Sequence, residues 1–105
     1  MRPLSTKKFR RWCREIRTLC PTDIPVRVRR VDRLPEDRTG DCTRRKDHWS
    51  IRIWSGLCAQ ATAEWLVHEW THVLCDEDEI GQEADHSEDY WIMYGSVYRA
   101  FYGED

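Results

Sequence analysis

Residues 65–75 read WLVHEWTHVLC, and the interpretation of the whole chain depends on this stretch. Apolar side chains recur at helical spacing through it and upstream of it, which predicts one helix from about residue 57 to residue 75. Because residues four apart lie one turn apart on the same helix face, His68 and His72 are predicted to lie side by side. The predicted buried stripe consists of Ala59, Ala63, Leu66, Val67, Trp70 and Leu74.

The two histidines flank a glutamate in the order His68-Glu69-x-x-His72. Imidazole nitrogens one helical turn apart can both bind one Zn2+, at about 2.1 Å each. Glu69 is rotated by about 100° from His68, so its carboxylate suits a water in an open coordination position better than the metal itself. Zinc lowers the pKa of such a water to about 7, and the glutamate takes its proton. The motif therefore predicts hydrolysis of peptide bonds, with Glu69 as general base.

A zinc site of this kind needs a third protein ligand, and the residues leave its identity open. The longer metzincin pattern would place glycine at position 75 and histidine at position 78, where this chain has Cys75 and Asp78. His86 is the preferred candidate, because it begins the predicted last helix after a loop long enough to fold back. The alternatives are the carboxylates of Glu79, Glu83 and Asp85, the imidazole of His48 and the thiol of Cys75.

Two further helices are predicted, one near each end of the chain. The first is capped by Ser5 or Thr6 and ended by Pro21. The last runs from about Asp85, a capping residue with Glu88 three positions on, to about Tyr102 and is closed by Gly103. The apolar stripe of the first helix is Phe9, Trp12, Cys13, Ile16, Leu19 and Cys20, and that of the last is Tyr90, Tyr94, Val97 and Phe101.

Between the first two predicted helices, apolar and polar residues alternate, which predicts a small sheet of about three strands. In residues 24–31, IPVRVRRV, valines alternate with arginines as in a half-buried strand. Residues 41–54, DCTRRKDHWSIRIW, are typical of a hairpin, and Pro35 and Gly40 mark a loop before it. With 105 residues, the chain is expected to form a single α+β domain over residues 1–105.

Charge is divided unevenly along the chain although the net charge is only −2. Residues 1–52 contain sixteen Lys and Arg against seven Asp and Glu, whereas residues 53–105 contain one Arg against twelve Asp and Glu. Such a division is typical of two halves that attract each other in the fold, or of a face that binds nucleic acid. The acidic run 76–79 could recruit basic substrates or could simply be solvated.

The five cysteines, at positions 13, 20, 42, 58 and 75, are odd in number and form no CxxC pair. This spacing argues against a disulfide framework and against a cysteine zinc knuckle. Basic residues interrupt the first twenty positions, so no signal-peptide core is visible, and no stretch approaches the ~18 apolar residues that span a bilayer. We therefore expect a soluble protein of a reducing cytoplasm with no membrane contact.

LVHEWTHVL followed by DHSEDYWIMYGSVYRAF resembles the SprT-like and small phage-type metallopeptidase-like zincins. The IRIW strand and Gly40-Asp41-Cys42 are also similar, so the resemblance covers most of residues 39–102. Where that family has a Gly-Pro pair after its third histidine, this chain has Ser87 and Glu88. The resemblance implies a minimal zincin-like domain, with Zn2+ held by His68, His72 and His86, catalysis by Glu69, and a bacterial or phage-infected host cell.

Stabilisation of the transition state needs a donor to the oxyanion, and Tyr90 and Tyr94 are the candidates because they follow His86 on the same helix side. Core packing is the favoured interpretation of both side chains. The leading hypothesis is a zinc endopeptidase that prefers flexible segments or a dedicated protein partner. The alternatives are a non-catalytic zinc-binding fold that contacts nucleic acid or a protein through its basic N-terminal half, and a metal-free helical scaffold.

Overall fold

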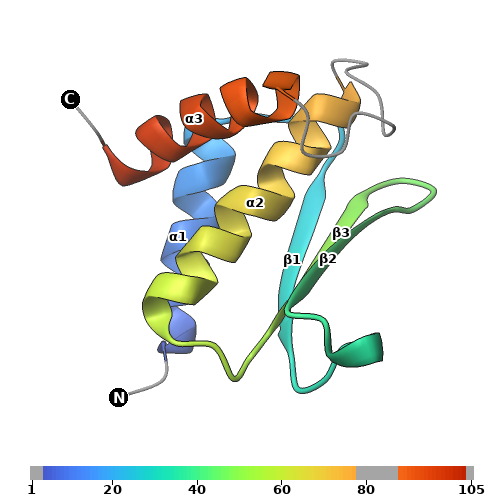
Figure 1. Cartoon of the computed structure of the whole chain (residues 1–105), viewed down its shortest axis with the longest axis vertical. Helices are drawn as coiled ribbons and strands as arrows, with labels where there is room; N and C mark the ends of the chain where they lie inside the picture. Colours follow the sequence, from blue (N-terminus) through green and yellow to red (C-terminus); the bar gives the residue numbers. More distant parts are fainter. Residues whose placement is uncertain (1–3, 78–87, 104–105) are drawn as a thin grey trace.

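The computed structural model of the chain describes residues 4–77 and 88–103. Its elements follow the α+β order predicted from the sequence, with three helices and a three-stranded mixed sheet (Figure 1). They are α1 Thr6–Leu19, β1 Val26–Val31, a 3-10 turn at Pro35–Asp37, β2 Gly40–Arg44, β3 Trp49–Trp54, α2 Ala59–Glu77 and α3 Glu88–Tyr102. The α+β fold class is confirmed.

The sheet has the order β1-β3-β2, so β3 is central and both other strands lie at edges. β2 and β3 form the predicted antiparallel hairpin, while β1 pairs with β3 in parallel, with Val28 opposite Ile51. β2 starts at Gly40, which the sequence had placed in the preceding loop. Ile51 and Ile53 on β3 are fully buried, because a central strand lies between both neighbours and under the helices.

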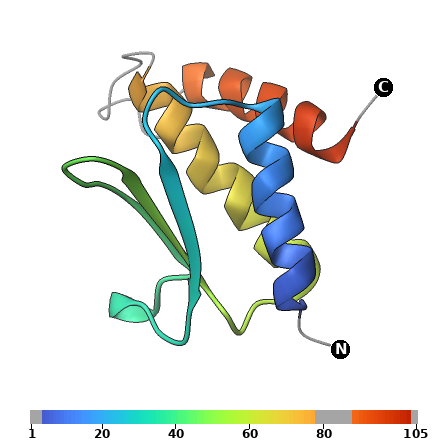
Figure 2. The same cartoon turned by 180° about the vertical axis from the view of Figure 1, so that it is seen from behind.

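The helices lie together on one side of the sheet, and α3 crosses the ends of α1 and α2 (Figures 1 and 2). The core between the layers is apolar. Trp70 of α2 is fully buried, and its indole N–H donates to the carbonyl of Cys20 at 2.8 Å. This bond ties the middle of α2 to the end of α1. The fully buried apolar residues of the core include Ile16, Ile51, Ile53, Leu66, Val67, Trp70 and Val73.

Helix α1 begins as predicted, because the Ser5 hydroxyl accepts a hydrogen bond from the Lys8 N–H at 3.1 Å. Phe9, Cys13 and Ile16 are buried. The assignment of Leu19 to the apolar stripe is wrong, since its side chain is 51% exposed. Leu19 is the last residue of the helix, and its side chain faces away from the described elements that pack on this end of α1.

Helix α2 is longer at its C-terminus than predicted and ends at Glu77. The Glu77 carboxylate accepts hydrogen bonds from the backbone N–H groups of Asp23 and Ile24, at 3.0 and 3.1 Å. Helix α3 buries Tyr90 and Val97, and Gly103 after it has the left-handed φ of 67° expected of a helix terminus. The predicted cap Asp85 lies outside the described residues. No helix in the described ranges is both long and apolar enough to cross a membrane.

Candidate active site

His68 and His72 lie side by side in the second half of α2, and both are half-buried. Their ring centroids are 5.0 Å apart and their planes are inclined by 75°. Two imidazoles that bind one tetrahedral zinc, at about 2.1 Å from each nitrogen, have centroids about 5 Å apart. The predicted side-by-side position of the two histidines is therefore observed, and the ring spacing is compatible with two ligands of one zinc ion, which stays a prediction.

Glu69 points to a different side of α2 from the histidines and lies against β2. Its side chain is only 4% exposed. A methyl group built on Gly40 would lie 3.5 Å from Glu69 Oε2 and 3.1 Å from a ring carbon of Trp65. The absence of a side chain at Gly40 therefore lets α2 approach the strand, with the Glu69 carboxylate between them.

Negative charge gathers where α2 faces β2. The pKa of the Cys42 thiol lies well above its ordinary value, mainly because of burial and then because of the charges of Glu69, Asp41 and Asp76. A thiolate is therefore disfavoured at Cys42, which rules against this cysteine as a nucleophile at neutral pH.

Tyr90 brings α3 onto the histidine pair. Its side chain is 2% exposed, and its hydroxyl donates to the His68 carbonyl oxygen at 3.0 Å. Its ring centroid lies 4.7 Å from that of His72 and 5.6 Å from that of His68. Tyr90 is thus part of the wall around both imidazoles.

Tyr94, the second tyrosine that the sequence singled out, lies one turn further from the histidines. Its ring is 6.2 Å from the Tyr90 ring, and burial followed by the charge of Glu64 raises the pKa of its phenol. The geometry brings Tyr90, but not Tyr94, into ring contact with the histidines in the described structure. A role for either hydroxyl in stabilising an oxyanion stays a prediction.

Trp65 is a neighbour of the site that sequence reasoning missed. Its ring centroid lies 4.8 Å from that of His68, and it also meets Gly40 of β2. The signal was present in the spacing, because residues three apart on a helix are neighbours. Trp65 fills the space between the His68 ring and the sheet.

The preferred third ligand, His86, lies outside the described residues, as do Glu79, Glu83 and Asp85. Within residues 4–77 and 88–103, no three His, Cys, Asp or Glu side chains come close enough to hold a metal ion. His48 and Cys75 therefore do not complete a three-ligand group with the histidine pair. His48 instead contacts Asp47 at 2.7 Å beside the turn of the β2–β3 hairpin.

The chain was compared with known protein families, curated proteins and solved structures. No protein-family model, no curated protein and no solved structure matches the chain. The resemblance to zincins therefore depends on the quoted motifs alone.

Proposed function

We propose that the chain is a zinc-dependent metallopeptidase with Glu69 as its general base. The observation that supports this most directly is the pair of half-buried imidazoles, 5.0 Å apart, beside a buried glutamate. His68 and His72 would supply two ligands, and His86 is the residue expected to supply the third. When bound, zinc would acidify a water molecule and polarise the substrate carbonyl.

The chemistry assigned to the chain's own groups is proton transfer. The Glu69 carboxylate takes a proton from water as the water oxygen forms a bond to the peptide carbon. The same carboxyl group then gives that proton to the amide nitrogen as the carbon–nitrogen bond breaks. Burial of Glu69 against β2 suits this role, because a carboxylate that is held in one place needs little reorganisation.

The edge position of β2 indicates how a substrate would be held. The outer side of this strand has no described partner strand, and Gly40 at its start adjoins Glu69. An extended peptide can add to such an edge through backbone hydrogen bonds. Because residues 4–77 and 88–103 form no second lobe beside α2, we propose flexible protein segments as substrates.

The test compares zinc-loaded wild-type protein with Glu69→Gln on fluorescein-labelled casein, which is largely unstructured. Loss of the general base is expected to lower the rate by about 10²- to 10⁴-fold while one equivalent of zinc is retained. Glu64→Gln is the matched control, since Glu64 lies on the exposed side of the same helix and its side chain contacts only Gln60 among described hydrogen bonds. Equal cleavage by the wild type and Glu69→Gln would exclude the proposal.

A His68→Ala variant tests the metal separately from the catalysis. We expect it to lose zinc, measured by elemental analysis of the purified protein, and to become inactive. Zinc retained without any cleavage by the wild type would instead support the alternative, a non-catalytic zinc-binding fold. A metal-free wild type would support the helical scaffold.

A further inference from the structure

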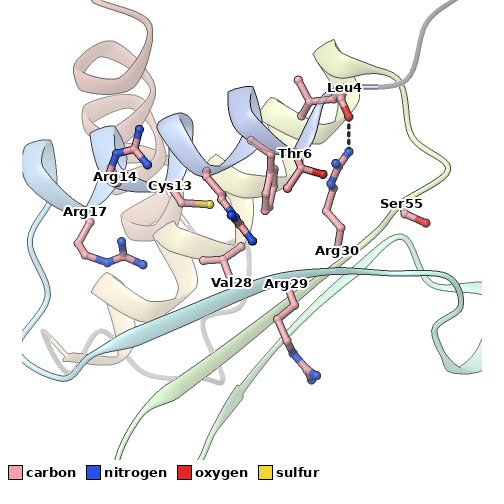
Figure 3. Close-up of a pocket in the computed structure, with 11 residues that line it drawn as sticks. Leu4, Thr6, Cys13, Arg14, Arg17, Val28, Arg29, Arg30 and Ser55 are labelled. Atoms are coloured by element: carbon pink, nitrogen blue, oxygen red, sulfur yellow. Dashed lines mark hydrogen bonds between the residues drawn. The ribbon is translucent and has the colours of Figure 1, made fainter.

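A groove of about 740 Å³ runs between α1 and β1, away from the histidine pair (Figure 3). Its lining residues come from the N-terminal segment, α1, β1 and Ser55, and none comes from α2, α3 or β2. Five of the eleven lining residues are arginines, namely Arg10, Arg14 and Arg17 of α1 and Arg29 and Arg30 of β1. This concentration of one charge sign in one groove is the feature to explain.

No carboxylate neutralises these arginines in the part of the chain that the structure describes. The arginine ion pairs found there involve other residues: Arg11 with Glu15, Arg38 with Glu36, and Arg52 with Asp41. The groove therefore has positive charge that described acidic side chains do not balance. Such a surface favours an anionic partner.

Two of the arginines are held in place by backbone carbonyl groups. Arg17 donates to the Val26 carbonyl at 3.1 Å. Arg30 donates to the Leu4 carbonyl at 2.9 Å, and this bond is drawn in Figure 3. Each guanidinium has five N–H donors, so most of them stay available to a ligand. Fixed guanidinium groups bind an anion with a smaller loss of side-chain entropy.

The field of three arginines reaches Cys13 on the floor of the groove. Burial raises the pKa of the Cys13 thiol to about 11, while Arg17, Arg30 and Arg14 act in the opposite direction. All three charges therefore lie near enough to Cys13 to act on its thiol. Arg29 differs, because its side chain is exposed and points away from α1 in Figure 3.

We propose that this groove binds the sugar–phosphate backbone of a single-stranded nucleic acid. Arg10 to Arg17 spans about 10 Å along the helix axis, a length that matches about three phosphates of one strand. Guanidinium forks also match phosphate oxygens in geometry.

The groove offers contacts to the backbone but no platform for bases. Phe9, its one aromatic lining residue, is buried, and the guanidinium of Arg30 lies 5.0 Å from its ring centroid. Stacking of bases on aromatic rings is therefore blocked at this place. We expect binding that is independent of sequence and strongly dependent on salt.

The test measures fluorescence anisotropy of a labelled 15-nucleotide oligo(dT) with the full chain at several salt concentrations. Each phosphate contact contributes a slope of about −0.7 to log K against log salt, which is about 5-fold in affinity at 0.1 M salt. Arg10→Gln/Arg14→Gln should therefore weaken binding about 25-fold and make the slope less negative by about 1.4. Neither arginine has a described hydrogen bond to the protein, so the fold should be kept.

The matched control is Lys7→Gln/Arg11→Gln, which removes the same charge from the same helix but outside the groove. It should bind within about threefold of the wild type, and circular dichroism should show all three proteins folded. If both double variants lost the same affinity for oligo(dT), the groove would be excluded as the binding site. Wild-type binding that does not weaken with salt, or tighter binding of poly-glutamate than of oligo(dT), would overturn the nucleic-acid ligand.

Discussion

Replacing Tyr90 by phenylalanine separates a structural role of its hydroxyl from a catalytic one. The substitution keeps the ring that lies 4.7 Å from His72 and removes the hydroxyl that donates to the His68 carbonyl oxygen. A typical intramolecular hydrogen bond contributes about 1 kcal/mol, and the His68 carbonyl lies in the middle of a helix and keeps its helical partner. We therefore expect Tm to fall by about 4 °C, given the size of the domain.

Because the hydroxyl of Tyr90 is buried and already donates to a backbone carbonyl, the expected effect on turnover is small. We expect kcat on an unstructured protein substrate to fall by less than about 10-fold and the zinc content to stay the same. Loss of a donor to an oxyanion would instead lower kcat by about 10²- to 10³-fold. Thermal denaturation gives Tm, and initial rates measured on the same preparations give kcat.

Tyr98→Phe is the control for this experiment, since Tyr98 lies on the same helix and is 39% exposed. It should change neither Tm nor turnover measurably. A Tyr90→Phe protein with an unchanged Tm and a kcat lowered 100-fold would refute the structural role and support Tyr90 as the oxyanion stabiliser. An unchanged Tm with unchanged kcat would show that the hydrogen bond to His68 contributes nothing.

Two further predictions concern the packing around the site and the buried thiols. Gly40→Ala should lower the free energy of unfolding, measured by urea titration, by about 1–3 kcal/mol, because its methyl group would lie 3.1 Å from the Trp65 ring. In the same assay, Gly95→Ala within helix α3 should raise the free energy of unfolding by up to about 1 kcal/mol. Since the folded pKa of Cys13 is raised to about 11 from 9.0, its stabilising contribution is complete below pH 9 and is lost as the pH rises to about 11. Between pH 8 and pH 10.5, the free energy of unfolding measured in urea should fall less in Cys13→Ala than in the wild type. An equal fall in both proteins would contradict the raised pKa of Cys13.

The helices and their buried faces were predictable because their signals are local. In α2, the spacing of apolar residues identified Ala63, Leu66, Val67 and Trp70, all of which are buried. The position of His68 beside His72 followed from the same periodicity, since four residues make about one turn. Leu19 shows the limit of this reasoning, because periodicity does not indicate where a covering element stops.

Contacts between elements were not predictable from single patterns. Alternation indicated three strands, but it carries no information about which strand is central or that β1 runs parallel to β3. The approach of Glu69 to Gly40 depends on that arrangement, because it brings β2 beside α2. The hydrogen bond from Tyr90 to the His68 carbonyl was also not predictable, because every residue has a backbone carbonyl and the sequence does not indicate which one accepts.

The uneven charge of the sequence had two interpretations, and the described ion pairs bear on them. Every ion pair between residues of the described ranges joins two residues of the first half, 1–52. Glu77, from the acidic half, accepts from backbone N–H groups of the first half and not from an arginine. Described ion pairs therefore do not account for an attraction between the halves. The arginines between α1 and β1 keep a charge that an external anion could balance, and this is the reason to test that groove with a phosphate-bearing ligand.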